Sequence, residues 1–284
     1  MQIYSIDTGL FKLDGGAMFG TVPKVIWQKI VPADENNLCT WSMRCMLVVD
    51  GNRKILIDTG MGNKQSEKFF SYYYPSGEAT LLGSLTDTGY TAADITDVIL
   101  THLHFDHCGA AVKKEGDALL PTFPHATYWS NQSHWKWATD PNPREKASFL
   151  KENMLPLAEA GCLQFIEEKK GEKTRFSENI EILFSYGHTA AMMCPMIRFR
   201  DKTIVFVADL IPSSAHIPLS YIAGYDMFPL IAMEEKKQFL EEAADQGYIL
   251  FFGHDAENEC ATVHRTEKGI RMKDKLSLKN VISS

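Results

Sequence analysis

Apolar residues gather in short runs along this chain, and polar or turn-forming residues separate one run from the next. Runs of this kind are typical of buried β-strands. Asp50-Gly51-Asn52 and Asp201-Lys202 each separate two neighbouring runs, which predicts two hairpins. We expect an edge strand over 1–13 and further strands at 44–49, 54–57, 98–100, 126–128, 163–166, 180–184, 196–200, 203–207 and 248–252.

Helical patterns lie between these runs. Residues 234–246 show the composition and the apolar period of an α-helix. Thr91 and Asp94 have the form of a capping box, which predicts a short helix before the strand at 98–100. The aromatic-rich segment 64–86 is expected to hold one or two more helices. We therefore interpret the chain as an α/β scaffold.

Three segments depart from the regular pattern. Residues 14–27 combine glycines and Pro23 with apolar side chains, so we expect an irregular loop that packs on the core or lines a pocket. Residues 129–158 are expected to form a helical insert in two pieces, divided by Pro141 and Pro143, beside the site where it can act as a lid. Residues 210–229 are rich in turn formers and aromatic residues.

Length and composition are ordinary for a soluble globular protein. The chain has 284 residues, of which 45% are hydrophobic and 23% are charged. We expect one domain over residues 1–284, with a short C-terminal tail after residue 265, because no linker-like composition separates the two halves. The net charge of −7 and the lack of a dense Lys/Arg block argue against a nucleic-acid partner.

Targeting signals are also missing from the pattern. No apolar run approaches the roughly 18 residues of a membrane span, and the N-terminus lacks the basic start and apolar core of a signal peptide. The six cysteines are scattered, with no CxxC pair, which favours buried thiols in a reducing compartment over disulfides. These features predict a cytoplasmic protein with no membrane partner.

The strongest chemical signal is the stretch THLHFDHCGA at Thr101–Ala110, directly after the apolar run 98–100. Neutral imidazoles and carboxylates are the ligands that borderline divalent metals take. On an extended segment, side chains two positions apart point the same way, and a turn at 105–107 would send the next pair in another direction. One segment can thus offer two pairs of ligands to two neighbouring ions. The four candidate ligands are His102, His104, Asp106 and His107.

Four more polar residues each follow an apolar run at a strand end. They are Asp58, His188, Asp209 and His254. Taken alone, Asp58 is compatible with a plain Asx turn, but metal-bound histidines also need a hydrogen-bonding partner that fixes their orientation. We expect His125, His134 and His264 to be structural or surface residues, and Cys108 to be a small packing residue beside the site.

The H-x-H-x-D-H motif, followed in order by His188, Asp209 and His254, resembles the signature of the metallo-β-lactamase superfamily of hydrolases. Within it, the apolar segment 14–27 is similar to the N-terminal loop of the quorum-quenching lactonase and methyl parathion hydrolase branch. The resemblance spans residues 1–265. It implies an α/β (α+β) fold, a four-layer αββα sandwich of two mixed β-sheets. It also implies two divalent metal ions, of which zinc is the first candidate and manganese, iron and cobalt are the alternatives.

Carried over position by position, the resemblance assigns a role to each residue of the motif. One ion is expected to bind His102, His104 and His188. The other is expected to bind Asp106, His107 and His254. Asp209 and a water would bridge the ions, and Asp58 would orient the metal loop from behind. A bridging hydroxide would attack the substrate, with Asp106 and Asp209 as the catalytic carboxylates.

The resemblance implies a small-molecule substrate, and lactone or ester bonds come first, with N-acyl homoserine lactones as candidates. Related homoserine lactonases carry a tyrosine three residues after the bridging aspartate, but this chain has Pro212 there. Thiolester hydrolysis of the glyoxalase II kind and phosphotriester hydrolysis are the alternatives, and a homodimer is possible. The substrate-contact candidates are Phe19, His216, Tyr221 and Tyr225.

Overall fold

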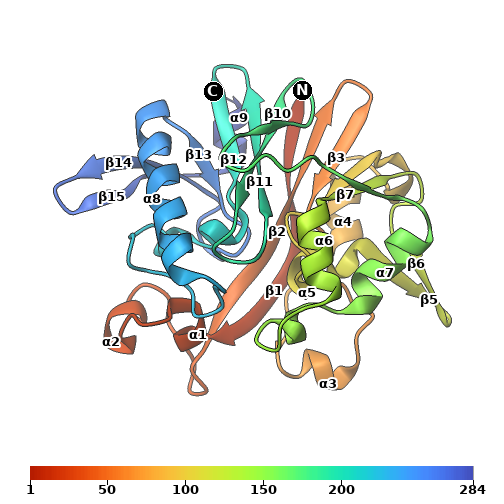
Figure 1. Cartoon of the computed structure of the whole chain (residues 1–284), viewed down its shortest axis with the longest axis horizontal. Coiled ribbons are helices and arrows are strands. Elements are labelled where there is room, and N and C mark those ends of the chain that lie inside the picture. The colour runs from red at the N-terminus through yellow and green to blue at the C-terminus, as the bar shows by residue number, and fades with distance from the viewer. Residues whose placement is uncertain (284) are drawn as a thin grey trace.

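The computed structural model describes residues 1–283, and two mixed β-sheets packed face to face form its centre (Figure 1). The first sheet has the order β1 (Gln2–Asp14), β2 (Leu38–Asp50), β3 (Arg53–Ile57), β4 (Asp97–Ile99), β7 (Thr127–Ser130) and β8 (Leu163–Phe165). The second has the order β15 (Gly269–Leu276), β14 (Cys260–Thr266), β13 (Ile249–Phe251), β12 (Lys202–Phe206), β11 (Met192–Phe199), β10 (Ile180–Ser185) and β9 (Thr174–Arg175). β5 (Val112–Glu115) and β6 (Ala118–Pro121) form a separate ribbon.

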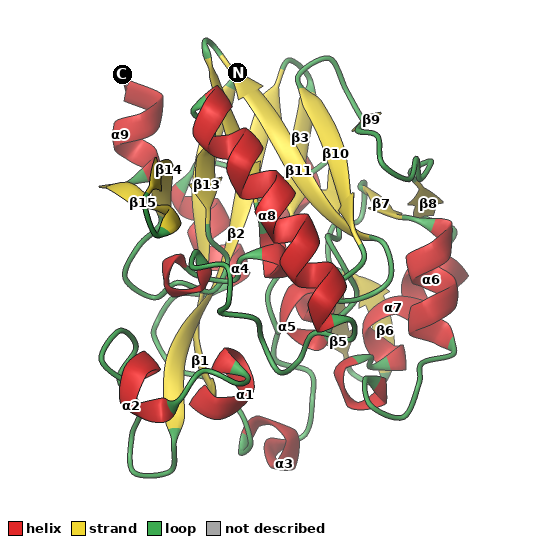
Figure 2. Cartoon of the chain, turned by 60° about the vertical axis from the view of Figure 1, so that its left-hand side comes forward, coloured by secondary structure: helices red, strands yellow, loops and turns green. Residues whose placement is uncertain are grey.

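Helices cover the outer faces of both sheets. α8 (Pro229–Gln246) lies across the second sheet (Figure 2). The first sheet is covered by α4 (Leu81–Asp87), α6 (Gln132–Thr139) and α7 (Lys151–Glu159). The αββα layering expected from the sequence is confirmed. The remaining helices are short: α1 (Gly15–Phe19), α2 (Lys24–Trp27), α3 (Glu67–Phe70), α5 (Phe105–Cys108), α9 (Leu278–Ser283) and the 3₁₀ turns η1 (Ala92–Asp94), η2 (Gly109–Ala111), η3 (Lys146–Ser148), η4 (Ala208–Leu210) and η5 (Ser214–His216).

The first sheet is buried on both faces, which explains its continuous apolar runs. Along β2, Met46 and Val48 pack between the two sheets, whereas Cys45 and Leu47 pack under the covering helices. Successive residues of a strand point to opposite faces, so a strand with two buried faces needs apolar residues at every position. The hairpins β2–β3 and β11–β12 are confirmed, with β3–β4 and β12–β13 paired in parallel.

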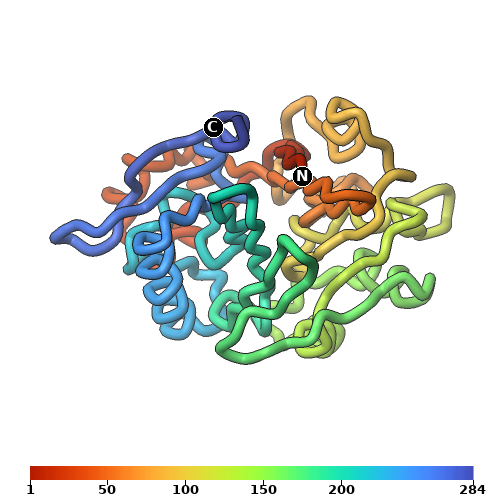
Figure 3. The backbone as a smooth tube through the Cα atoms, turned by 90° about the horizontal axis from the view of Figure 1, so that it is seen from above, coloured from red at the N-terminus to blue at the C-terminus, as the bar shows by residue number. Residues whose placement is uncertain are grey.

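The two halves of the chain build the two sheets (Figure 3). The red segment that holds α1 and α2 is an exception, since it lies against the second half (Figures 1 and 3). The backbone of Gly224 donates to Ala17 O at 2.7 Å, and His216 Nε2 lies 2.9 Å from Met18 O. None of the helices within residues 1–283 has the length and apolarity needed to cross a bilayer.

The segment 14–27 differs from the irregular loop that we expected, because it contains the short helices α1 and α2. The Asp14 carboxylate accepts a hydrogen bond from Ala17 N at 2.8 Å and so caps α1. Phe19 and Trp27 are buried and stack with ring centroids 5.3 Å apart. The glycines concealed this helical turn, but the expected packing of the segment on the core is confirmed.

The segment after residue 265 is not a tail. It forms the edge strand β15 and the helix α9, and Leu278 and Val281 of α9 are buried in the core between the sheets. Gly269, with φ of 86°, makes the turn that returns the chain antiparallel to β14. Charged residues alternate with Ile270 and Met272 along β15, so its apolar content was too low to predict a strand.

Candidate metal centre

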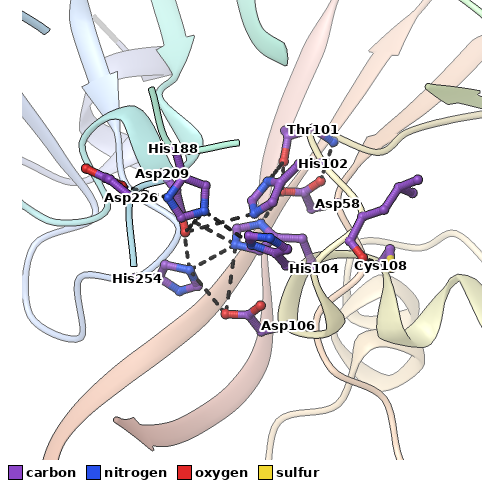
Figure 4. Close-up of polar contacts among 12 residues, drawn as sticks. Asp58, Thr101, His102, His104, Asp106, Cys108, His188, Asp209, Asp226 and His254 are labelled. Atoms are coloured by element: carbon purple, nitrogen blue, oxygen red, sulfur yellow. Dashed lines mark hydrogen bonds and ion pairs between the residues drawn. The ribbon is translucent and has the colours of Figure 1, made fainter. Parts of the chain in front are cut away.

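The strand ends of both sheets converge at one edge of the sandwich, and each supplies polar side chains to a single cluster (Figure 4). β3, β4, β10, β12 and β13 all end there, which gathers residues far apart in the sequence. Loops that follow parallel strands are the usual place for a site on such a scaffold. The cluster consists of His102, His104, Asp106, His107, His188, Asp209 and His254, with Asp58 behind it.

The metal loop after β4 changes direction where the sequence predicted a turn. His104 is the N-terminal cap position of α5, and the backbone N–H of His107 donates to His104 O at 3.1 Å. Asp58 lies behind this turn and accepts from Thr101 N and from His107 Nδ1, each at 2.8 Å. Asp58 has φ of 60°, a left-handed conformation that aspartate tolerates better than most residues.

Four of the five histidines of the cluster are held through Nδ1, which leaves Nε2 facing the centre. Thr101 Oγ1 donates to Asp58, so it accepts from the Nδ1–H of His102 at 3.1 Å. Such partners determine the tautomer and the ring orientation of a metal-binding histidine. The other three Nδ1 contacts, each of 2.8 Å, are His107 to Asp58 Oδ2, His188 to Asp226 Oδ1 and His254 to Ser42 O.

His104 is held the other way round. Its Nε2 donates to Glu145 Oε1 at 2.9 Å, and its Nδ1 faces the centre, 3.2 Å from His188 Nε2. Hydrogen bonds from His104 and Trp137 keep the pKa of Glu145 at about 2, although burial alone would raise it. The inward atom of His104 is therefore selected by an acidic residue from the insert.

Asp209 lies between two groups of imidazoles. Its Oδ1 lies 3.2 Å from His254 Nε2 and 3.4 Å from His107 Nε2. Its Oδ2 lies 3.3 Å from His188 Nε2 and 4.0 Å from His102 Nε2. The two oxygens of one carboxylate thus face different sides of the cluster.

The donor set fits divalent cations. The ligand atoms of three groups each lie within 4.8 Å of one another: His102, His104 and His188; His102, His107 and Asp209; and Asp106, His107 and His254. The buried atoms without a hydrogen bond of suitable geometry among residues 1–283 include His102 Nε2 and Asp209 Oδ1, although imidazole nitrogens lie near both. An unsatisfied buried polar atom costs about 1–3 kcal/mol, and a cation in the centre would satisfy both.

The carboxylates also control the charge of the imidazoles. Burial opposes protonation of His107, but the carboxylates of Asp209, Asp106 and Asp58 raise its pKa well above the usual range. In the same way Asp209 raises the pKa of His188 and of His254 against their burial. Burial and neighbouring histidines lower the pKa of His102. In the metal-free centre, the carboxylates therefore favour the protonated, cationic form of His107, His188 and His254.

The cluster forms the floor of a pocket of about 350 Å³. The segment Arg144–Ser148 of the insert borders this pocket. The insert was expected to lie beside the site. Tyr225 also lines the pocket, as expected for a substrate contact. The other walls are largely apolar and include Leu13, Met18, Tyr73, Phe105 and Met227.

The other three substrate-contact candidates pack beside the pocket and do not line it. Phe19 is fully buried and stacks on His216, with ring centroids 4.7 Å apart. The rings of Tyr221 and Phe19 are nearly perpendicular, with their centroids 6.3 Å apart. We therefore carry only Tyr225 forward as a direct contact, with Phe19, His216 and Tyr221 as a supporting cluster.

Residues outside the metal motif have the expected structural positions. His125 and His264 are exposed, and His134 is buried with both ring nitrogens hydrogen bonded. Cys108 is buried, with its thiol 3.2 Å from Leu103 O. Burial raises the pKa of this thiol, which keeps it protonated.

Sequence reasoning left several residues of the site without a role, among them Asp226, Glu145 and Tyr73. Asp226 and Glu145 hold two of the histidines, and Tyr73 lines the pocket. Asp226 lies in the segment 210–229 that was already singled out, next to Tyr225. Glu145 and Tyr73 lie in irregular segments, where no strand end or spacing identifies them.

Fold and site together define a class of protein: an αββα sandwich with a buried centre of imidazoles and carboxylates, suited to divalent metal ions, at the floor of a pocket. Residues 44–254 match the family model of the Metallo-beta-lactamase superfamily. The chain belongs to this superfamily, and it is a metal-dependent hydrolase.

Several known proteins are similar over nearly the whole chain. An N-acyl homoserine lactonase from Bacillus cereus is 23% identical over 278 residues, which cover 91% of this chain and 94% of the relative. A probable metal-dependent hydrolase from Staphylococcus aureus has a TM-score of 0.86 at 26% identity, with 97% and 98% of the two chains covered. AidC, a dizinc quorum-quenching lactonase solved with a product, has a TM-score of 0.79 at 20% identity, with 97% and 95% covered.

Proposed function

We propose that this protein is a dinuclear metal-dependent lactonase that opens lactone or ester bonds, with N-acyl homoserine lactones as the first candidates. The observation that carries the proposal is Asp209, whose two oxygens face two groups of histidines at the floor of a largely apolar pocket. The similarity to lactonases of the same superfamily supports the choice of substrate.

In the proposed site, His102, His104 and His188 would hold one ion, and Asp106, His107 and His254 would hold the other. Asp209 would offer an oxygen to each. Zinc is the first candidate, and manganese, iron and cobalt suit the same ligands. When bound, two such ions supply an ionised water as the nucleophile and a Lewis acid for the substrate's carbonyl oxygen.

The residues of the chain have three tasks in this reaction. Three of the histidines are held in one tautomer by Asp58, Asp226 and the carbonyl of Ser42, so that the inward Nε2 of each of the three offers a lone pair. Asp106 and Asp209 present carboxylate oxygens at the floor of the pocket, where a carboxylate can carry a proton to the leaving alkoxide. The apolar walls exclude water and can accept an acyl chain.

A substrate panel tests this function. Zinc-loaded protein is given N-acyl homoserine lactones of short and long chain, simple γ- and δ-lactones, an aryl phosphotriester and S-lactoylglutathione, and proton release is recorded. Chain-length-dependent opening of the lactones is the expected result, with His102→Ala protein as the blank. Turnover of the phosphotriester or the thiolester alone would assign the same centre to that reaction.

Three expectations from the sequence stay predictions: a single-domain chain, a cytoplasmic location and a homodimer.

Tyr225→Phe is expected to raise KM for the preferred lactone about 2- to 10-fold and to leave the metal content unchanged. This change in KM corresponds to the loss of one hydrogen bond of ~0.5–1.5 kcal/mol. Tyr225 lines the pocket, and the structure of residues 1–283 shows no hydrogen-bond partner for its hydroxyl, which is free to bind a substrate oxygen. Steady-state kinetics and metal analysis check this. Tyr72→Phe, at a tyrosine that is 61% exposed, is the control. Loss of metal in Tyr225→Phe protein would contradict the substrate role.

A further inference from the structure

The insert reaches the metal centre through a buried glutamate whose charge has no structural cation to neutralise it. Glu145 is 2% exposed, and among the described residues its only ion-pair partner is His104. A buried carboxylate without a Lys or Arg partner is costly. A functional role explains why this unfavourable burial is kept, if the carboxylate orients the imidazole that it contacts.

Both oxygens of Glu145 are in use, which fixes the orientation of the carboxylate. Oε1 accepts from His104 Nε2 at 2.9 Å, and Oε2 accepts from Trp137 Nε1 at 2.6 Å. Asn142 Nδ2 also lies 3.4 Å from Oε2, and the Glu145 N–H donates to Asn142 Oδ1 at 3.2 Å. The insert therefore holds Glu145 rigidly against His104.

A second buried residue of the insert links two of the loops that carry candidate ligands. His134 is fully buried; its Nε2 accepts from Leu103 N at 2.8 Å, and its Nδ1 donates to Ala190 O at 2.7 Å. Leu103 lies between His102 and His104, and Ala190 follows closely after His188. His134 thus joins the two loops that hold these three histidines.

The hydrogen bonds from the insert to the candidate ligands and their loops lie on one side of the centre. Glu145 contacts His104, and His134 contacts the loops that carry His102, His104 and His188. On the other side, His107 is held by Asp58 after β3, and His254 is held by Ser42 O of β2. Among the described residues, the insert therefore orients a ligand of one candidate ion position by a hydrogen bond and none of the other, although α7 also packs against α5.

We propose that Glu145 is a positioning residue that directs Nδ1 of His104 to the metal centre, so that the helical insert controls the affinity of one ion position and leaves the other unaffected. The inference rests on the proposed dinuclear site. It makes the insert a part of the metal-binding structure as well as a wall of the pocket.

Glu145→Gln tests the proposal because an amide has a single oxygen. In one orientation the amide oxygen accepts from His104, and the NH₂ donor then faces the N–H donor of Trp137. In the other orientation the oxygen accepts from Trp137, and the NH₂ donor then faces the Nε2–H donor of His104. We expect the affinity for one of two zinc ions to fall about 10- to 100-fold, the usual effect of losing a residue that orients a metal ligand, while the other is unchanged. Competition of metal-free protein with a chromophoric chelator measures both affinities.

Cobalt(II) gives an independent readout, because its visible absorption reports the ligand geometry of each ion. Glu145→Gln is expected to alter the bands of one cobalt ion only. Glu159→Gln, at the exposed last residue of α7 directly after the insert, makes the same charge change and should match the wild type. If Glu145→Gln protein does not fold, Trp137→Phe removes the 2.6 Å contact but keeps the carboxylate, and the same ion should be weakened to a smaller extent.

Two results would overturn the role of Glu145 while the dinuclear site stands: wild-type affinity for both ions in Glu145→Gln protein, or equal weakening of both. Wild-type protein that binds fewer than two zinc ions would refute the dinuclear site and this inference with it. Loss of one ion with the other retained supports the proposal.

Discussion

Asp209→Ala is expected to lower the rate of hydrolysis by at least about 10²–10³-fold, the loss typical of removing one preorganised charge from a reaction centre, and to lower the metal content with it. The Asp209 oxygens lie 3.2 Å from His254 Nε2 and 3.3 Å from His188 Nε2, one on each side of the centre. Removing the carboxylate therefore weakens both ion positions together, unlike the one-sided effect expected at Glu145.

Metal analysis after gel filtration, together with initial rates on the preferred lactone, checks this prediction. Asp201→Ala, at an exposed aspartate in the turn between β11 and β12, removes the same charge at the end of these strands opposite the metal centre and should retain two ions and full activity. Undiminished hydrolysis by Asp209→Ala protein, or full activity of wild-type protein stripped of metal, would exclude the dinuclear mechanism.

The seven candidate ligands lie in four short segments that each come after an apolar run, so their meeting at one edge was predictable from the sequence, and the resemblance to the superfamily assigned their roles. A strand end is a local feature, and two sheets packed face to face bring several strand ends to the same edge. The turn at 105–107 was predictable for a related reason: His102 and His104 share one side of an extended segment, and α5 then redirects Asp106 and His107. The runs that are apolar at every position predicted strands with two buried faces, and their arrangement as a sandwich followed from the resemblance to the superfamily.

The partners of those ligands were not predictable in the same way. Glu145 contacts His104 across 41 residues, and Asp226 contacts His188 across 38, each from an irregular segment without period. Their positions depend on how the insert and the segment 210–229 pack, which no local pattern encodes. The same limit applies to the edge strand β15, because one exposed face gives it many charged residues.

Removing both metal ions is expected to lower the midpoint of thermal unfolding by about 10–20 °C relative to protein with zinc at 100 times the Kd of each site. Each bound ion then contributes ~2.7 kcal/mol, and each kcal/mol is worth about 2–4 °C in a chain of this size. The carboxylates and imidazoles of the centre make the difference in unfolding midpoint between zinc-loaded and metal-free protein depend on pH. Asp209 raises the pKa of His107, His188 and His254 against their burial in the metal-free protein.

The sign of that dependence follows from linkage. A histidine with a raised pKa in the folded state stabilises the metal-free fold below its unfolded pKa of about 6.5, and that stability is lost as pH rises through the folded pKa. Zinc displaces these protons, so binding releases them and becomes tighter as pH rises. The difference in unfolding midpoint between zinc-loaded and chelator-treated protein should therefore widen from pH 6 to pH 9.

Scanning fluorimetry at constant free zinc, with matched chelator samples at each pH, measures this difference, and a weakly buffered titration records the protons released. Asp209→Ala protein is the informative comparison, with free zinc raised until its weakened ion positions are saturated. Without that carboxylate the imidazoles lose the main charge that raises their pKa, so fewer protons are released and the dependence on pH flattens. In wild-type protein, the difference in unfolding midpoint between zinc-loaded and chelator-treated samples could instead stay constant or narrow as pH rises. That result would show that the imidazoles are already neutral before zinc binds, and that the carboxylates serve only as ligands.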